Sequence, residues 1–444
     1  MTAAVEQRPP ASAGAPRAAR RRGITTPATM RAMLAALVLL SLAWGAFGGW
    51  VASVHAAAAG AMATVDEPLS LDAQQLYESI ADADVTATTM FLASSRPPLP
   101  SLQAYAGDIG TASAALSRLR AAGGQNQVTS AALAALGGDL PRYTGYVAEA
   151  RSAYALGYPL TGGSFVQVAS EEAHLELLPA AKTVFDQEND RLTAASGQAT
   201  GLPLVVGALL LAIVGGVLLY RAQRWLTRRT NRAVNVGLAL ASALLVISAG
   251  WLVAGFLGGR SDLEAGIGHG SQPAEQLAQA SIDVQRIRGD AVLNVISRSG
   301  DTSFQSDFTT TSGQVGPGRL SLLSTAAAAE SRGSAAASLV AAAEREAATW
   351  YTANEDVYRL GAAAHYADER AQVIGTGAAS SAAGYDVLEP DIIQAINDDQ
   401  SAFQTAVSAG SGAFNPVEPV VVTASLLMAL GCLWGLSRRL AEYR

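Results

Sequence analysis

Four long stretches of the chain are apolar and contain no Asp, Glu, Lys or Arg. They cover residues 32–54, 202–220, 233–257 and 420–437. About 20 apolar residues in a helix cross a hydrocarbon core of about 30 Å. The pattern therefore predicts four transmembrane helices, at 32–54, 202–220, 233–257 and 418–437, with Pro416 and Pro419 at the entry to the last one.

The first stretch has a second interpretation, as a cleaved signal peptide. Basic residues precede it and an Ala-rich segment follows it, at 55–63. However, the basic leader is long, about thirty residues. The apolar run is also longer than the apolar region of a signal peptide, which has about 7 to 15 residues. The pattern favours an uncleaved anchor, and cleavage would remove one span without changing the remaining topology.

Arginine residues predict how the spans are oriented. The loop 221–232 carries five arginines and no acidic residue, and the tails 1–31 and 438–444 are also basic. Cytoplasmic flanks of transmembrane helices are enriched in Lys and Arg, so we place these three segments in the cytoplasm. Segments 55–201 and 258–417 then lie outside. The chain is thus expected to be a multi-pass plasma-membrane protein with both termini in the cytoplasm.

The charge balance of the two long segments agrees with this topology. Residues 54–201 contain 15 acidic and 7 basic residues, and residues 258–417 contain 19 acidic and 9 basic residues. The single cysteine, Cys432, lies in the fourth span, which excludes an intrachain disulfide. Lys182 is the only lysine of a chain rich in Arg, Ala and Gly, as is typical of a GC-rich, actinobacterial genome.

Both outer segments have a helical pattern and the size of one domain each. Apolar residues recur at spacings of three and four, and Gly and Pro clusters divide each segment into a set of four helices. The expected divisions are Pro97–Pro100, Gly123–Gly124, 137–141 and Gly162–Gly163, then Gly300, 313–318, Gly333 and 375–377. The fold class is therefore all-α, with two extracytoplasmic helical bundles.

The two outer segments also resemble each other, which suggests an internal duplication. Gln75-Leu76 precedes Ser79-Ile80 much as Gln276-Leu277 precedes Ser281-Ile282. Pro179 and Pro390 are each followed by apolar residues at plus six and plus thirteen. The repeated unit would be a span, an outer domain and a second span.

No motif for catalysis, nucleotide binding or metal binding occurs in the sequence. The four histidines are far apart and none has zinc-type spacing, so we expect no enzyme, no cofactor, no metal and no nucleic-acid partner. Glu171, Glu172, His174 and Glu176 form the densest titratable group. Residues 172 and 176 could bind a cation from one helix face, but a solvated acidic face is the favoured interpretation.

Two groups of arginines are candidates for binding. Arg286 and Arg288 follow the third span and could hold an anionic ligand such as an amino-acid carboxylate, since guanidinium suits that geometry. A pairing with Asp283 or Asp290 on the same surface is the favoured alternative. The cytoplasmic loop could dock a partner or anionic lipid through its arginines, although topology alone explains them; they are Arg221, Arg224, Arg228, Arg229 and Arg232.

The four spans and paired outer bundles resemble the sensor halves of bacterial chemoreceptors and sensor kinases. The chain differs from those proteins because only about twelve and seven residues follow its second and fourth spans, with no coiled-coil tail or kinase. Its length, Arg/Ala-rich composition, basic leader and span arrangement resemble the actinobacterial GlnX-type membrane proteins. That resemblance implies a relay from a GlnH-like extracytoplasmic solute-binding protein to a PknG-like cytoplasmic Ser/Thr kinase.

The sequence thus favours a transmembrane relay that senses an extracytoplasmic amino acid or a solute-binding protein. A structural or scaffolding role at the cell envelope is the alternative. A transporter ranks lower because the spans lack charged residues, which usually mark a transport pathway. The short cytoplasmic segments require a partner for any effect inside the cell, and a homodimer is compatible with the pattern.

Overall fold

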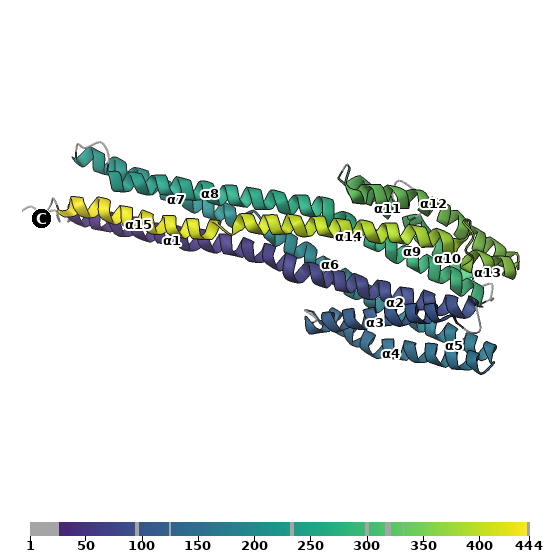
Figure 1. The fold of residues 1–444 in the computed structure, drawn as a ribbon. Coiled ribbons are helices and arrows are strands. Elements are labelled where there is room, and N and C mark those ends of the chain that lie inside the picture. The colour runs from purple at the N-terminus through teal and green to yellow at the C-terminus, as the bar shows by residue number, and fades with distance from the viewer. Residues whose placement is uncertain are drawn as a thin grey trace, which may run out of the picture. The chain divides into compact units, whose positions relative to one another are not determined.

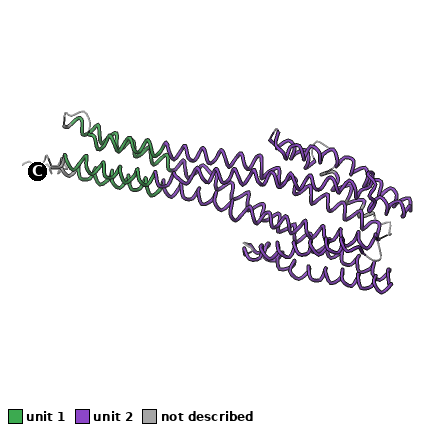
Figure 2. Tube along the Cα trace, in the orientation of Figure 1, with its two compact units in different colours: residues 1–47, 208–249, 421–444 green, residues 48–207, 250–420 purple. Residues whose placement is uncertain are grey.

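The protein is all-α wherever its structure is described. The computed structural model describes residues 26–93, 97–123, 126–230, 235–297, 302–315, 321–331 and 333–441, and every regular element in these ranges is a helix (Figure 1). The residues divide into two compact units. Unit 1 comprises Met1–Phe47, Ala208–Ala249 and Val421–Arg444, and unit 2 comprises Gly48–Gly207 and Gly250–Val420 (Figure 2). The predicted fold class is confirmed.

Unit 1 contains most of each of the four apolar stretches. They belong to helices α1 (Thr26–Ala61), α7 (Pro203–Thr230), α8 (Val236–Gly266) and α15 (Val417–Ala441). Four helical runs of the described chain are long and apolar enough to cross a membrane, and each contains one of these stretches. The prediction of four membrane-capable helices is therefore confirmed.

Small residues allow the helices of unit 1 to approach each other closely. Gly237 of α8 lies directly against the backbone of Gly431 and Gly435 in α15. The indole nitrogen of Trp44 in α1 donates a hydrogen bond to Ser248 Oγ in α8 at 3.1 Å. Close backbone contact and a buried interhelical hydrogen bond are the usual sources of helix association in an apolar solvent.

Unit 2 contains two sets of helices. The first set is α2 (Glu67–Ala93), α3 (Leu99–Ala121), α4 (Gln127–Ala155), α5 (Pro159–Glu172) and α6 (Leu178–Ala199). The second set is α9 (Gln272–Ser297), α10 (Thr302–Val315), α11 (Leu322–Ala329), α12 (Ala335–Ala362), α13 (Tyr366–Ile374) and α14 (Ser381–Phe414).

The two sets share one hydrophobic core, although the sequence suggested two separate bundles. Leu76 and Ile80 of α2 belong to the same buried cluster as Leu277 and Ile287 of α9. Helix α2 also packs along α9. The apolar faces of α2 and α9 bury each other, so the two sets of helices form two halves of one unit.

Two of the helix divisions expected in the first set are wrong. Residues 137–141 lie inside α4, and Gly162 and Gly163 lie inside α5. Their glycines serve close packing: a Cβ at Gly137 would overlap the Arg120 guanidinium, and one at Gly162 would overlap the Tyr154 ring. The chain turns instead at 156–158. In the second set, Gly333 and 375–377 lie between helices as expected. Of the division expected at 313–318, residues 313–315 still belong to α10, and 316–318 lie outside the described residues, as does Gly300.

The turns that end α4 and α12 have the same backbone geometry. The Tyr158 amide donates to the Ala153 carbonyl at 2.9 Å, and the His365 amide donates to the Leu360 carbonyl at 2.9 Å. The residue before each donor has a positive φ, +82° at Gly157 and +58° at Ala364. This is the left-handed helix ending that glycine favours. The repeated turn supports the duplication suggested by the sequence.

Three short π-helices interrupt long helices in the part of the chain that the structure describes. They are η1 (Met62–Asp66), η2 (Ala173–Leu177) and η3 (Ile267–Ser271). Each is followed two residues later by a proline, Pro68, Pro179 or Pro273. Proline has no amide donor and clashes with the carbonyl four residues earlier, and a wider turn relieves that clash. The order helix, π-helix, helix occurs in both halves, as α1–η1–α2 and as α8–η3–α9.

Candidate functional site

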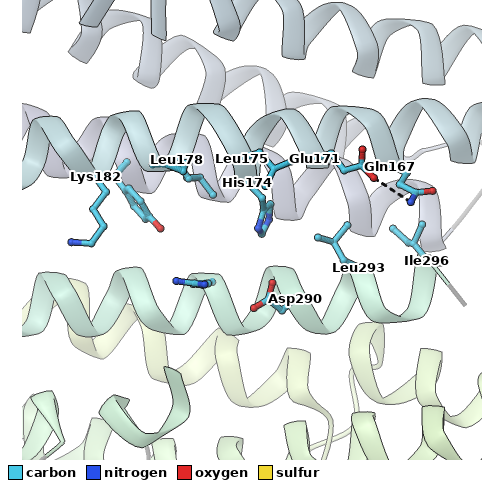
Figure 3. A pocket seen from close by; sticks show the side chains of 12 residues that line it. Gln167, Glu171, His174, Leu175, Leu178, Lys182, Asp290, Leu293 and Ile296 are labelled. Atoms are coloured by element: carbon cyan, nitrogen blue, oxygen red, sulfur yellow. Dashed lines mark hydrogen bonds between the residues drawn. The ribbon is translucent and has the colours of Figure 1, made fainter. Parts of the chain in front are cut away.

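A cavity of about 540 Å³ lies between the two halves of unit 2. One wall comes from α5, η2 and α6, and the opposite wall comes from α9, with Tyr77 of α2 contributing one side chain (Figure 3). In Figure 3, Lys182 lies at one end, Glu171 and Gln167 lie at the other, and His174 and Asp290 lie between them. The cavity is therefore bounded by elements from both halves, and its polar groups differ along its length.

Two cations line this cavity, Lys182 of α6 and Arg286 of α9. Lys182 pairs with Asp186 at 2.8 Å, and its amine also donates to the side-chain oxygen of Gln279 on α9 at 3.3 Å. Its side chain is 41% exposed, so the amine remains accessible from solvent. These cations give the cavity a region suited to a carboxylate or another small anion.

Acidic groups face the remainder of the cavity. Asp290 follows Arg286 by one helical turn on α9, and Glu171 accepts a hydrogen bond from the Gln167 amide at 3.4 Å. Leucine and isoleucine side chains fill the space between the polar groups; they are Leu175, Leu178, Leu293 and Ile296. A ligand with one anionic group, one cationic group and a small apolar part matches this lining.

His174 occupies the centre of the cavity and is anchored from behind. Its Nε2 lies 3.3 Å from Asp84 Oδ2, and the same oxygen accepts a hydrogen bond from Ser170 Oγ at 2.7 Å. Burial lowers the pKa of His174, but the hydrogen bond and charge of Asp84, with the charge of Asp290, outweigh it and raise the pKa. The two carboxylates therefore stabilise positive charge on the imidazole ring.

Gly289 allows α9 to approach the His174 ring. A Cβ at this position would lie 3.1 Å from the ring, which is tighter than ordinary van der Waals contact. Tyr77 closes the cavity with a buried phenol whose pKa is raised by burial, so the hydroxyl stays neutral. The centre of the site thus depends on close contact between the two halves.

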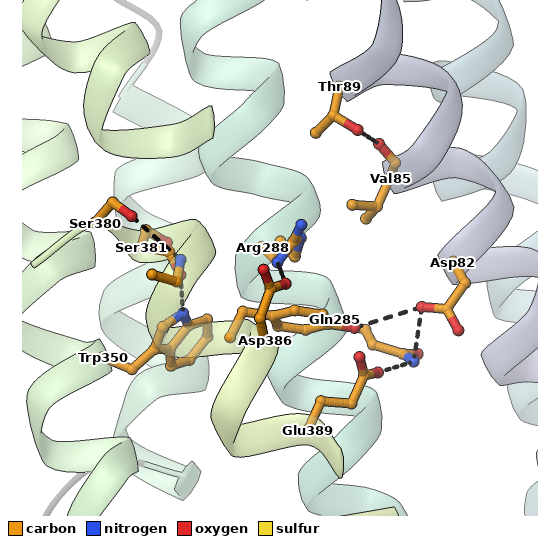
Figure 4. A network of polar contacts seen from close by, with 12 residues as sticks. Asp82, Val85, Thr89, Gln285, Arg288, Trp350, Ser380, Ser381, Asp386 and Glu389 are labelled. Carbon is orange, nitrogen blue, oxygen red and sulfur yellow. Dashed lines mark hydrogen bonds and ion pairs between the residues drawn. The ribbon is translucent and has the colours of Figure 1, made fainter. Parts of the chain in front are cut away.

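Arg286 lines the cavity, but Arg288 does not. Arg288 packs over the Tyr385 ring, with 3.9 Å from the guanidinium carbon to the ring centroid, and its Nη1 lies 3.7 Å from Asp386 Oδ1 (Figure 4). The structure therefore separates two residues that the sequence placed in one candidate site. Arg288 joins α9 to α14 by contacts that resemble neither of the sequence alternatives.

The surroundings of Arg288 form a polar network between the halves. Gln285 donates to Asp82 at 3.3 Å and to Glu389 at 2.8 Å (Figure 4). Burial, followed by the charge of Glu389, raises the pKa of Asp82, and burial also raises the pKa of Glu389 itself. On the neighbouring side, burial raises the pKa of Glu78 to about 7. Several carboxyl groups thus gather around one guanidinium where α2 meets α9 and α14.

The arginines predicted to face the cytoplasm lie in a different part of the sequence from this cavity. Arg221, Arg224 and Arg228 are exposed on α7. The side chain of Arg229 and the whole of Arg232 lie outside the described residues.

The sequence patterns did not identify several residues of this site as binding residues. His174 and Glu171 belong to the titratable group that we interpreted as a solvated face, but only part of that group is solvated. Glu172 pairs with Arg142 at 2.5 Å, whereas His174 is directed into the protein. Asp84 lies 90 positions away in the sequence, so no local spacing connects it to His174. The charged run on one helix was the only available signal.

Comparison with known proteins supports a sensing role for the first half. No curated protein and no solved structure matches the chain. One family model does match, over residues 58–197, which include α2 to α6 and therefore His174, Lys182 and Tyr77 but not α9. Residues 58–197 are similar to the actinobacterial sensor domain, which identifies a sensor segment in this chain and agrees with an actinobacterial source.

Proposed function

We propose that the protein is a transmembrane sensor that binds an extracytoplasmic amino acid in the cavity between α6 and α9. The observation that carries this proposal is the mixed charge of the cavity: Arg286 and Lys182 suit a carboxylate, and Asp290 suits an ammonium group. The leucine and isoleucine walls suit an apolar side chain. One wall of the site belongs to the segment that matches a sensor domain.

Ligand binding would alter the packing of two helices that lead toward the spans. Helix α9 continues through η3 into α8, and α6 ends at Ala199, four residues before α7 begins at Pro203. Small shifts of packed helices are an established means of transmitting a binding event. We assign the final effect to a cytoplasmic partner, such as the Ser/Thr kinase suggested by the resemblance to GlnX-type proteins.

A solute-binding protein is a second candidate for the input. The turn between α4 and α5 exposes three large apolar side chains, Leu156 at 74%, Tyr158 at 63% and Leu160 at 89%. Exposed apolar clusters of this kind often mark protein contacts. In this alternative the amino acid binds the partner, and the cavity responds only to the docked complex.

Calorimetry on the full chain in detergent tests the proposal. Each of the common amino acids would be titrated into the wild-type protein and into Arg286→Gln, with Arg345→Gln, an exposed arginine of α12, as the matched control. We expect binding of at least one amino acid, weakened about tenfold or more in Arg286→Gln and unchanged in the control, because a charge-assisted hydrogen bond is lost. Absence of heat with every amino acid on folded protein contradicts the proposal.

Binding and capture experiments on the same detergent-solubilised protein distinguish the remaining functions. Binding of a solute-binding protein that is lost in Leu160→Ser, together with no binding of free amino acids, supports the second candidate. Capture of cell-envelope assembly proteins without any ligand response supports the scaffolding role. Each result selects one function by a different measurement.

A further inference from the structure

Unit 1 contains a cavity of its own, of about 300 Å³, between the first part of α1 and the last part of α7. Its walls are largely apolar and include Met33, Leu37, Leu218 and Ala222. Both helices belong to the membrane-capable set, so the cavity would face lipid in a membrane. Apolar cavities bind apolar groups in preference to water. An acyl chain is the apolar group that a membrane supplies at this place.

The rim of the cavity is basic. Arg221 lines it, and Arg224 and Arg228 follow at plus three and plus seven, so the three exposed arginines share one side of α7. Arg224 is held by a hydrogen bond from its Nη1 to the hydroxyl of Tyr220 at 3.1 Å. Neither α1 nor α7 contains an acidic residue, so no charge on these helices offsets the arginines.

Trp225 lines the cavity one turn beyond Arg221. Tryptophan and tyrosine concentrate at the level of lipid headgroups, and arginine there pairs with phosphate. Along α7, Leu218 of the apolar wall precedes Arg221, and Arg224, Trp225 and Arg228 follow. This order matches the order of groups in a phospholipid, from acyl chain to phosphate to headgroup.

We propose that this cavity binds an anionic phospholipid, with one acyl chain between α1 and α7 and its phosphate at Arg221. Basic pockets between transmembrane helices recognise anionic headgroups by this combination of charge and shape. The excess of positive charge selects an anionic headgroup over a zwitterionic one. This site is separate from the amino-acid cavity of unit 2 and does not depend on the proposed sensing function.

Native mass spectrometry of the full chain, released from detergent with defined lipids, tests the proposal. Phosphatidylglycerol and phosphatidylcholine with identical acyl chains are offered in equal amounts. The variants are Arg221→Gln and Ala36→Phe, in which a ring at an exposed lining position obstructs the cavity. Arg438→Gln on α15 is the matched control, because Arg438 lies over the Trp434 ring and does not line the cavity.

Wild-type protein and Arg438→Gln are expected to retain phosphatidylglycerol about fivefold better than phosphatidylcholine. This ratio corresponds to about 1 kcal/mol, the attraction of one arginine to an anionic lipid. Arg221→Gln should lose this preference while still binding an acyl chain, and Ala36→Phe should lose both lipids. Equal retention of the two lipids by the wild type, or equal effects of Arg221→Gln and Arg438→Gln, overturns the proposal. A helical circular-dichroism spectrum confirms that each variant is folded.

Discussion

The two halves of unit 2 end one long helix each, α4 and α12, with the same turn but use it differently. The first half places Gly157 at the left-handed position and surrounds it with exposed apolar side chains, whereas the second half places Ala364 there. The first half then continues through η2 into α6, while the second half breaks between α13 and α14. The two halves thus share the turn but differ in how the chain continues after it. The cavity lies between the halves.

The two halves each contribute one carboxylate near His174, and the two carboxylates have different roles. Both are buried, but Asp84, from the first half, binds His174 and Ser170, whereas Asp290, from the second half, lines the cavity. Asp84→Ala should lower the free energy of unfolding by about 3 kcal/mol, because it leaves buried polar groups without their acceptor. Asp290→Asn should have a smaller effect on stability and a larger one on ligand binding.

Thermal unfolding in detergent and the NMR titration of His174 measure this contrast. Loss of Asp84 should also lower the pKa of His174, since its hydrogen bond and charge hold that pKa up. Equal losses of stability in Asp84→Ala and Asp290→Asn would mean that the two halves support His174 alike, contrary to this comparison.

The carboxyl groups between the halves predict a pH dependence. The pKa of Glu78 is about 7 in the folded protein, raised by burial and by the charge of Glu389 from the other half. Between about pH 4.5 and 7 the folded state therefore holds more protons than the unfolded state. The free energy of unfolding should fall across this window as the pH rises, by on the order of 2 kcal/mol for this group, and then level off.

Unfolding midpoints measured from pH 5 to pH 8 test this trend. Glu78→Gln, which is permanently neutral, should reduce the slope, and Glu149→Gln, at an exposed position of α4, should leave it unchanged. An identical slope in the wild type and in Glu78→Gln would remove this residue from the pH response and leave the other carboxyl groups to explain any remaining slope.

The paired turns predict substitutions of opposite sign. Ala364→Gly should stabilise the protein by about 1 kcal/mol, because a left-handed conformation strains any residue with a Cβ. Gly157→Ala should destabilise it by about 1 kcal/mol for the same reason. Unfolding midpoints of the two variants measure the difference directly. Shifts of the same sign would mean that the two turns are not equivalent.

The features that the sequence predicted well are those set by local composition. The membrane-capable helices follow from long runs of apolar residues without charge. The π-helices were not predictable from proline alone, because Pro68, Pro179 and Pro273 follow such turns whereas Pro141 and Pro390 lie in ordinary α-helix. The neighbours of each proline decide whether the clash is relieved by a wider turn.

The features that the sequence missed depend on contacts between distant segments. The shared core of unit 2 requires knowledge that α2 covers α9, and the anchoring of His174 requires Asp84 from another helix. Gly137 and Gly162 have the composition of helix breaks, yet they make room for neighbouring side chains. A glycine that permits close packing and a glycine that ends a helix are identical in sequence, and only the tertiary neighbour distinguishes them.

The single lysine of the chain has a practical consequence. Lys182 is the only side-chain amine among 444 residues, and it lines the proposed ligand cavity with an exposed surface. A reagent that acylates amines can therefore modify one internal position only, apart from the chain terminus. Labelling at this position would attach a fluorophore to the cavity without mutagenesis, and the rate of labelling with and without solute would report directly whether the cavity is occupied.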